Sequence, residues 1–509
     1  WERECSVELI NESGLGAGQF QINGGVRIRG GFSRSDNNPK HAFRLFFRND
    51  YEGDLNYPVF QDEGPSSFEN LDLRTSQNYS WAFQNDSRNT FLREIHGRDA
   101  QREMEQAYTR SRYYHLYLNG VYWGLYMSQE RSEASYGETY FGGDEDDYDV
   151  IKSAGSSGGY TTEATDGNFD AWQDLWNKVR AIRSTPADDA AYFALQGLAA
   201  DGVSPHPDPA NNPNLLEVDN MIDYLLAIFH TGNFDAPLST FIQASNNWYG
   251  MRNRNGSEGF RFFVHDGEHS LGTGGNSNNR VGPWGDQYTG RPPSAFNRSN
   301  PQYMHEDLAW NEEYRMDFAD RVHKHFFNGG VLAEAASLSR MNARSVEIED
   351  AVRSELARWG GGFNYNTWLN ARQDVVNFLN KGTDGSGDGP GRAAYLIDVF
   401  RNYNHEGSKP LYPLIDAPVY AQNGGTVPDG FLLGVTNPNG SGTVYYTTDG
   451  SDPRLAGGAV NPSAAIASGN VALLQSGPLR SRVLSGGTWS AMNEFDFIVG
   501  VASSGDNLV

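Results

Sequence analysis

Hydrophobic and polar residues alternate along much of the first quarter of the chain, and this pattern predicts strands. Strands with tight turns are expected over residues 7–47, and another in Asn70–Thr75. Two more are expected in Tyr113–Gln129, joined at Asn119-Gly120, because this dipeptide tolerates the positive φ of a two-residue hairpin turn. The beginning of the chain is therefore predicted to be rich in sheet.

Apolar residues recur at helical spacing through the middle of the chain. The predicted helices are Asn89–Tyr108, Asn168–Ile182, Ala187–Leu198, Leu215–His230, His305–Phe327, Val331–Trp359, Thr367–Asn380 and Gly391–Tyr403. The acidic, glycine-rich segment Gly137–Tyr160 is expected to be a loop, and the glycine-rich segment 382–391 a flexible connection. Thr273–Pro301 is long for an unstructured loop, which makes it a candidate lid over a substrate.

The helical period ends near His405–Pro413, and the pattern changes to short strands with turn signals such as Asp449-Gly450. This change predicts a separate all-β, immunoglobulin-like sandwich of roughly 100 residues. The expected plan is an α+β domain over residues 1–405, followed by a sandwich module over residues 411–509.

Composition limits the function classes. The chain has 509 residues, 38% of them hydrophobic, and a formal net charge of -24. Such a charge disfavours nucleic acid and anionic membranes as partners. No apolar run reaches the ~20 residues of a membrane-spanning helix. With Cys5 as the one cysteine, neither an intrachain disulfide nor a cysteine-based zinc site is expected. The acidic, Gly-, Asn- and Tyr-rich composition fits an exported protein.

The candidate chemistry lies between residues 232 and 272. Asp235 follows a predicted helix in GNFDAP, the pair Asn246-Asn247 comes next, and a predicted strand over Phe260–Val264 leads to Asp266 and Glu268. In an extended chain the last two carboxylates would point the same way. Carboxylate and amide oxygens are ligands that Mg²⁺ accepts, and the order Asp, Asn, strand, Asp is that of a protein-kinase catalytic loop and metal site. Ordinary turn residues are the competing interpretation.

Two other metal sites are open on the pattern alone. His265 and His269 are four residues apart, the spacing of two zinc ligands on a helix, although Gly267 argues against a helix there. The acidic run Asp144–Asp147 could attract Ca²⁺, but it lacks the spacing of a known calcium loop, and a solvated acidic turn is the simpler interpretation.

Several of these segments resemble the CotH family of spore-coat kinase-like proteins. The matching text, in the order of the family, is RIRGGFSRS, PKHAFRLFF, NLDLRT, RYYHLYLNGVYWGLYMSQE, GNFDAP, NNWYGMRN and FRFFVHDGEHSLG. The resemblance implies an atypical, two-lobed protein-kinase-like fold, with an N-lobe over about 1–165 and a helical C-lobe over about 166–405. It also implies a secreted enzyme that uses ATP and Mg²⁺, or Mn²⁺ or Ca²⁺ in its place, to phosphorylate Ser or Thr of extracellular or cell-surface proteins.

The resemblance assigns roles residue by residue. Asp235 corresponds to the catalytic-loop Asp, Asn247 (or Asn246) and Asp266 to metal ligands, with Glu268 in support. Lys40 would contact phosphate, and Glu130 would orient a basic group or meet the nucleotide edge. Lys40 as a solvated strand lysine and Glu130 as a partner of a surface arginine are the structural alternatives.

The chain departs from the family pattern in three ways. Glu268 stands where the family has a second Asp, His265 replaces an aromatic or apolar residue, and the gap from Asp235 to Asn247 exceeds a usual kinase loop. A non-catalytic envelope, adhesion or structural protein is therefore an alternative. A carbohydrate-active protein is the third, with Asp235 and Glu268 as its carboxylate pair.

The end of the chain has a resemblance of its own. VYYTTDGSDPR resembles the small C-terminal β-sandwich of chitobiase-like proteins, modules that accompany extracellular enzymes. It could serve as a spacer or contact cell-wall glycan, and Trp489 could stack on a sugar or fill the core of the sandwich.

Overall fold

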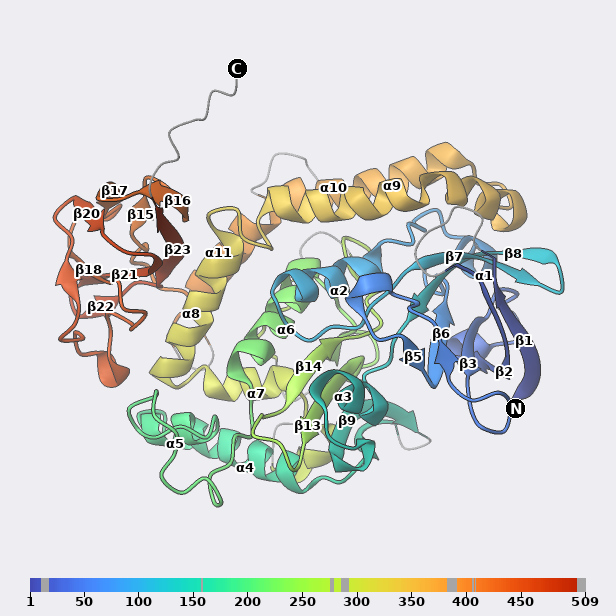
Figure 1. Ribbon diagram of the computed structural model, residues 1–509, viewed down its shortest axis with the longest axis horizontal. Coiled ribbons are helices and arrows are strands. Elements are labelled where there is room, and N and C mark those ends of the chain that lie inside the picture. Colours follow the sequence, from blue (N-terminus) through green and yellow to red (C-terminus); the bar gives the residue numbers. More distant parts are fainter. Residues whose placement is uncertain are drawn as a thin grey trace.

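The computed structural model describes residues 1–10, 18–156, 159–274, 279–284, 293–381, 391–404, 407 and 409–500 (Figure 1). It contains several separate sheets and a largely helical middle, which confirms a mixed α+β chain. Segment 382–390 and parts of the predicted lid, residues 275–278 and 285–292, lie outside the described residues. In the part that is described, no helix is both long enough and apolar enough to cross a membrane.

A six-stranded antiparallel sheet fills the N-terminal region. In spatial order its strands are β1 Arg3–Leu9, β2 Phe20–Arg29, β3 Ala42–Phe46, β6 Asn70–Arg74, β8 Val121–Gln129 and β7 Tyr113–Leu118. A separate two-stranded sheet, β4 Leu55–Asn56 and β5 Ser67–Phe68, lies between β3 and β6 in the sequence. Leu45 pairs with Leu71 and packs into a core, whereas their neighbours Arg44 and Asp72 pair on the opposite face. Alternation therefore gives the sheet one apolar face and one charged face.

The predicted hairpin at Asn119-Gly120 is confirmed. Leu118 of β7 pairs with Val121 of β8, and both turn residues have positive φ, 51° and 78°. This is the geometry for which the Asn-Gly dipeptide is suited, so the local signal was sufficient here.

The second sheet corrects one expectation. Gly137–Tyr160 is expected to be a loop, yet it contains the end of helix α3 Ala134–Phe141 and all of strand β9 Tyr148–Ser156. The sheet has the order β10 Gly159–Asp166, β9, β13 Trp248–Asn253 and β14 Arg261–Val264. Val150 and Ile151 of β9 are fully buried because β9 is paired on both sides. One of these neighbours, β13, is distant in the chain, and the acidic residues before β9 give no sign of the pairing.

Apart from α1, which lies outside every predicted helix, the following helices lie in the predicted regions with shifted ends. In chain order they are α1 Trp81–Gln84, α2 Arg93–Glu103, α4 Asp170–Ser184, α5 Asp189–Ala194, α6 Val218–Thr231, α7 Pro301–Leu308, α8 Glu312–Phe326, α9 Glu334–Trp359, α10 Tyr365–Lys381 and α11 Arg392–Arg401. The single helix expected over His305–Phe327 is wrong. The side chain of Asn311 caps the N-terminus of α8 by accepting from Tyr314 N, and this cap separates α8 from α7.

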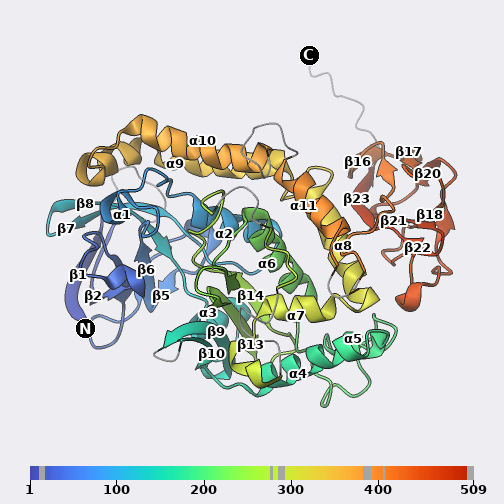
Figure 2. The same ribbon diagram turned by 180° about the vertical axis from the view of Figure 1, so that it is seen from behind.

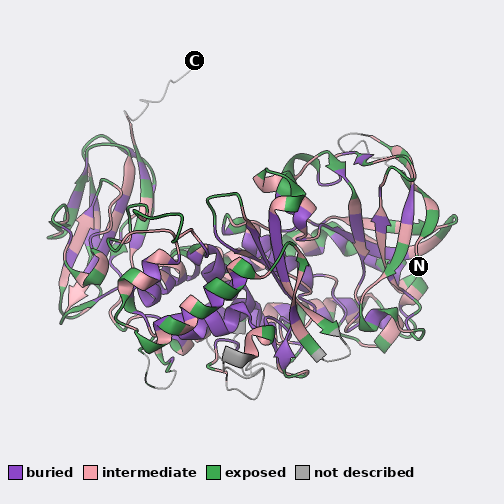
Figure 3. Ribbon diagram, turned by 90° about the horizontal axis from the view of Figure 1, so that it is seen from below, coloured by how far each residue is buried: buried purple, intermediate pink, exposed green. Residues whose placement is uncertain are grey.

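Helix α6 runs through the middle of the largest hydrophobic core, and nearly all of its residues are buried. Figure 3 shows that buried residues are concentrated in the interior of the helical middle and along the strands. It packs against α2, α8 and strand β14. It ends at Gly232, whose left-handed conformation (φ 62°) turns the chain sharply toward Asp235. The fixed position of α6 is what places the candidate site.

Two sheets with a shared hydrophobic core form the C-terminal region. One contains β15 Val419–Tyr420, β17 Phe431–Thr436 and β20 Asn470–Leu473; the other contains β16 Gly425–Pro428, β23 Asn493–Gly500, β21 Gly477–Ser485, β18 Thr443–Thr447 and β19 Ala465–Ile466, with β22 Thr488–Trp489 beside β21. Trp489 is buried and donates its indole N–H to the carbonyl of Gly458. This placement favours the core role that the sequence left open for Trp489.

Charged residues attach this C-terminal region to helix α8. Arg482 of β21 is buried and donates to Asp320 of α8 (2.8 Å) and to Asp452 (2.7 and 2.6 Å). Arg454 forms a bidentate pair with Glu313, also of α8, at 2.6 and 2.7 Å. Buried, multiply bonded arginines of this kind fix the geometry of an interface, since each would leave uncompensated charge if separated from its partners.

We expect Arg482→Met to loosen this attachment. Removing one partner of a buried ion pair costs about 3–5 kcal/mol, because Asp320 and Asp452 then face each other without a cation. Limited proteolysis should cut the variant between α11 and β15 much faster than the wild type, and thermal unfolding should begin earlier. Arg480→Met is the control, because its partners Glu494 and the Gly450 carbonyl both lie within the C-terminal region, and it should leave the cleavage rate between α11 and β15 unchanged. Equal cleavage of Arg482→Met and wild type would contradict the expectation.

Candidate functional site

Asp235 lies just beyond the end of α6. Its backbone N–H donates to the side-chain oxygen of Asn233 (3.0 Å), which holds the turn after Gly232. The carboxylate of Asp235 is almost fully buried, with 5% of the residue exposed. The core helix therefore delivers a carboxylate to a fixed, largely dry position.

The long gap between Asp235 and the Asn pair folds into a short hairpin. Strands β11 Leu238–Ser239 and β12 Ala244–Ser245 pair antiparallel and bring the chain back to its starting point. Asn246 Nδ2 donates to Asp235 Oδ1 (2.9 Å), and Asn247 Nδ2 donates to Asp235 Oδ2 (2.8 Å). The structure thus brings both candidate asparagines onto Asp235, and the unusual length of the gap does not displace them.

Asp266 follows β14 at the same centre. The strand ends at Val264, and Asp266 has a left-handed backbone (φ 49°). The expectation that Asp266 and Glu268 share a face by strand alternation therefore does not hold. The Asp266 side chain is 32% exposed, and its Oδ1 accepts a hydrogen bond from Arg74 Nη2 (2.8 Å). Asp266 is the most open carboxylate of the group and is available to a ligand.

The pKa of Asp235 is raised and that of Asp266 is lowered. Burial raises the pKa of Asp235 to about 6, and the charge of Asp266 acts in the same direction. Burial also acts to raise the pKa of Asp266, but the Arg74 guanidinium, with His265 and Arg29, outweighs it and lowers that pKa. Asp235 and Asp266 are therefore close enough to interact electrostatically, and Asp266 stays ionised.

The Glu268 side chain is hydrogen-bonded to the segment that follows β6. Its oxygens accept hydrogen bonds from the backbone N–H groups of Gln77 and Asn78, both at 2.9 Å, and from Asn78 Nδ2 (3.1 Å). Burial, followed by the charge of Asp266, raises the pKa of Glu268 to about 7. The structure thus places Glu268 beside Asp266 but gives it the task of holding the segment that follows β6.

The arginine that contacts Asp266 belongs to an ion-pair chain that the sequence analysis missed. Arg74 Nε lies 3.2 Å from Glu94 Oε2 of α2, and Glu94 Oε1 accepts from Arg98 (2.8 Å) and Gln129 (2.7 Å). Arg74 is buried, so it couples Asp266 to α2 through a single side chain. The sequence did contain a hint of this role, because Arg74 is a charged residue within the predicted strand NLDLRT, of which the analysis considered only the leucine pattern.

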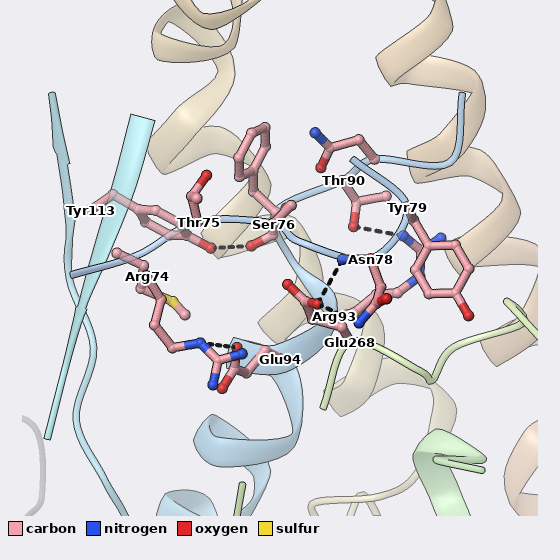
Figure 4. Close-up of a pocket in the computed structure, with 13 residues that line it drawn as sticks. Arg74, Thr75, Ser76, Asn78, Tyr79, Thr90, Arg93, Glu94, Tyr113 and Glu268 are labelled. Carbon is pink, nitrogen blue, oxygen red and sulfur yellow. Dashed lines mark hydrogen bonds and ion pairs between the residues drawn. The ribbon is translucent and has the colours of Figure 1, made fainter. Parts of the chain in front are cut away.

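A small pocket lies next to these ion pairs (Figure 4). Figure 4 shows Arg74 meeting Glu94 on one side of the pocket and Glu268 reaching the backbone of Asn78 on the other. Tyr113 and Phe91 are among the apolar residues that line it. The pocket therefore lies between the sheet, the start of α2 and Glu268.

Lys40 does not join this centre. Its ammonium is 2% exposed and contacts Glu355 Oε1 of α9 (2.6 Å) and the carbonyl of Leu125 (3.0 Å). Burial lowers the pKa of Lys40, and Glu355 acts against that shift. Lys40 is thus neither the solvated strand lysine nor a side chain free for phosphate in this arrangement.

Glu130 is also occupied elsewhere. Its Oε2 accepts from the backbone N–H of Arg110 (2.8 Å) and from Arg110 Nη1 (3.2 Å), and Tyr140 donates to its Oε1. Burial raises the pKa of Glu130, which Arg110 opposes. The arginine-pair alternative describes these contacts better than a free nucleotide contact does.

Two further arginines, Arg29 and Arg44, meet at Asp72 on the charged face of the N-terminal sheet. Arg44 forms a bidentate pair with the buried Asp72, at 2.6 and 3.0 Å, and Arg29 pairs with the same carboxylate. Arg29 is also close enough to Asp266 to lower its pKa. The acidic centre is therefore approached by guanidinium groups from Arg29 and Arg74.

The other metal sites considered from the sequence receive no support. Asp144 and Asp147 cap a short 3-10 turn through a reciprocal capping box. The His265 ring packs on Tyr249, whereas His269 Nδ1 contacts the Tyr79 hydroxyl (2.8 Å), and no helix joins the two histidines. Throughout the described residues, no group of three or more His, Cys, Asp and Glu side chains could hold a metal. Any metal at the main centre would need amide ligands besides its carboxylates.

The donor set of that centre fits a hard divalent cation. Asp235, Asp266 and the amide of Asn247 offer oxygen ligands, which Mg²⁺ accepts together with water and substrate phosphates. Carboxylates that stay ionised and an amide held against them are typical of a kinase-like metal site. This centre contains the aspartate and asparagine residues that the sequence analysis selected as candidates for a kinase-like site.

The comparisons identify the family. Residues 26–383 match the family model described as CotH kinase protein, and the chain belongs to this family. The match covers most of the chain and ends before the C-terminal sheets. Among curated proteins, the search finds no match.

Proposed function

We propose that the protein transfers a phosphoryl group from ATP, with Mg²⁺, to Ser or Thr hydroxyls of secreted or cell-surface proteins. The observation that carries this proposal is the convergence of Asn246 and Asn247 on Asp235, with the more open Asp266 close enough to interact with it electrostatically. Mn²⁺ or Ca²⁺ could be accepted by the same oxygens. Membership of the CotH kinase family supports a kinase-like activity.

The proposed roles follow from the contacts. Asp235 orients the acceptor hydroxyl and accepts its proton, while Asn246 and Asn247 hold the carboxylate in place. Asp266 and Asn247 hold the metal, which when bound would neutralise charge on the transferring phosphoryl group. Arg74 fixes Asp266 and also pairs with Glu94, so that one basic side chain joins the metal-binding aspartate to helix α2.

In this proposal Arg29 and Arg44, rather than Lys40, contact the phosphate. Arg29 and Arg44 share the buried Asp72, and planar guanidinium groups suit phosphate oxygens. Lys40 and Glu130 keep structural roles, since Glu355 and Arg110 occupy them. Glu268 supports the metal site indirectly, by holding the Gln77–Asn78 segment.

The finer description of the fold is part of the same proposal. We take the six-stranded sheet with α2 as a kinase-like N-lobe, and the helices around α6 as a C-lobe. The C-terminal sheets are an immunoglobulin-like, chitobiase-like module; their buried Trp489 and their ion pairs with α8 favour a supporting role over glycan contact. An extracellular or cell-surface location follows from the proposed substrates.

One observation favours a second candidate, a kinase-like envelope or adhesion protein without activity. Glu268, at the family's second acidic position, spends both oxygens on the Gln77 and Asn78 amides, which leaves fewer free carboxylates for metal. A nucleotide-binding measurement separates the two candidates.

We expect Mg·ATP to stabilise the protein against thermal unfolding. A ligand at 100 times its Kd adds about 2.7 kcal/mol, so the shift should be readily measured. ATP with EDTA should give a much smaller shift, and incubation with radiolabelled Mg·ATP and a mixed Ser/Thr peptide library should label peptide. A flat thermal response to every nucleotide, with no labelling, would favour the inactive candidate.

A further inference from the structure

Helices α9 and α10 form a long pair that extends over the N-terminal half of the molecule. Figures 1 and 2 show the pair lying across the top of the structure, from the neighbourhood of α11 to the hairpin of β7 and β8. Helix α9, with 26 residues, contacts both α2 and β8. A segment from the second half of the chain therefore spans the sheet and the helix that carries Glu94.

The first half of α9 binds α2. Arg344 forms a bidentate pair with Asp99 of α2, at 2.7 and 3.0 Å. One turn earlier, Arg340 donates to Glu103 at the end of α2 (2.9 Å) and contacts His96 (3.3 Å). Three side chains of α2 are therefore held by two arginines of α9.

The second half of α9 binds the sheet. Glu355 accepts from Lys40 Nζ (2.6 Å) and from the backbone N–H of Leu125 (2.7 Å), and all of this is buried. Gly124 makes the approach possible, because a Cβ there would lie 2.5 Å from Glu355 Oε2. Trp359 adds a hydrogen bond to the carbonyl of Trp123. The contact with Glu355 of α9 explains why Lys40 is buried.

Helix α2 is also fixed on its other side. A Cβ on Gly97 would lie 3.2 Å from Val264, the residue that ends β14 two positions before Asp266. Glu94, at the start of α2, reaches Arg74 and through it Asp266. Helix α2 is thus confined between α9 and the strand that leads into the candidate site.

We infer that α9 is a built-in strap that fixes α2 where Glu94 meets Arg74, with Arg344 and Glu355 as positioning residues for the site. This inference rests on the proposed function for its catalytic consequence. In protein kinases the glutamate-bearing helix must be brought into place before the enzyme is active, and phosphorylation of an activation loop commonly controls that step. Here the strap does this permanently, so the site is assembled in the free protein and needs no activating modification.

The test compares Arg344→Ala with Arg353→Ala in the full chain. Arg353 lies on the same helix, but its partner Asp350 is solvent-exposed, which makes it a matched control. Hydrogen exchange of the Arg93–Glu103 amides should become at least about tenfold faster in Arg344→Ala and stay unchanged in Arg353→Ala. The KM for Mg·ATP should rise about five- to tenfold in Arg344→Ala, while the KM for the acceptor peptide stays constant. Arg344→Lys, which keeps one contact to Asp99, should recover part of both effects.

The outcomes separate the strap from the proposed function. Unchanged exchange in α2, or faster exchange spread evenly over the whole chain, would overturn the strap. Phosphatase treatment of the wild type should leave its affinity for Mg·ATP unchanged, and a marked loss would overturn the claim that no modification is needed. If the wild type bound no nucleotide but α2 loosened selectively in Arg344→Ala, the proposed function would fail and the positional role of α9 would stand.

Discussion

Asp266→Asn is expected to reduce phosphotransfer about 10²–10³-fold or more while the protein stays folded. Asp266 is the most exposed carboxylate at the centre, and Arg74 lowers its pKa, so it is ionised at neutral pH and can hold a cation. An amide keeps the shape but loses the charge that a metal on phosphate requires. Initial rates at saturating Mg·ATP, together with the thermal shift caused by Mg·ATP, measure the effect.

Glu268→Gln is the control that makes this measurement specific. Glu268 accepts from backbone amides, and a glutamine carbonyl can keep one of those hydrogen bonds. We therefore expect Glu268→Gln to retain much more activity than Asp266→Asn. Equal losses would return Glu268 to the role of a metal ligand, and equal activity of Asp266→Asn and wild type would remove Asp266 from the mechanism.

The elements whose determinants are local were predictable from the sequence. The Asn119-Gly120 turn needs only positive φ at two adjacent residues, and the pattern of α6 needs only its own apolar period. Asp235 and Asp266 could be selected because each follows such an element. The course of the chain between Asp235 and Asn246 could not be predicted from such local signals. The strands there, β11 and β12, have only two residues each, which is too short to show an alternating pattern.

The partners of charged residues could not be predicted, because they are distant in the chain. Lys40 meets Glu355, 315 residues away, and Arg74 meets Asp266, 192 residues away. A lysine in a strand motif and a glutamate in a surface-like helix carry no local sign of each other. The contacts of Lys40 could not be foreseen for this reason, and Arg74 was omitted for the same reason. Burial of β9 was hidden in the same way, since its neighbours β10 and β13 lie on either side of a long helical insertion.

The long-range contacts hold the residues of the candidate site on several different elements of the fold. The core helix α6 places Asp235, strand β14 places Asp266, and the sheet contributes Arg74. Helix α9 then holds the sheet and α2 against each other through Glu355 and Arg344. Each participating side chain is anchored on a different regular element, and this is how a fold keeps a constellation in place with little reorganisation.

Arg74→Met is expected to have the second largest effect, on stability as well as on activity. Arg74 is buried between Glu94 and Asp266, and Glu268 lies nearby. Without the guanidinium, these carboxylates would repel one another in a poorly solvated place, at a cost of about 3–5 kcal/mol. Phosphotransfer should fall more than about 100-fold, because Asp266 loses its orientation. Arg74→Lys should recover charge but not both contacts, since an ammonium lacks the fork of a guanidinium.

The pH dependence of unfolding provides the decisive check on Arg74. Arg74 lowers the pKa of Asp266 in the folded protein, so this pair contributes stability above the unfolded pKa of about 3.9 and loses it as pH falls toward the lowered value. The difference in unfolding free energy between wild type and Arg74→Met should therefore be large at pH 7 and shrink below about pH 4. Arg27→Met removes a more exposed pair with Glu2, whose pKa Tyr51 and Arg48 also lower, so this variant should show a much smaller loss and only a weak pH trend. A difference that stayed constant from pH 7 to pH 3 would mean that Arg74 acts through packing alone, and would contradict a stabilising ion pair between Arg74 and Asp266.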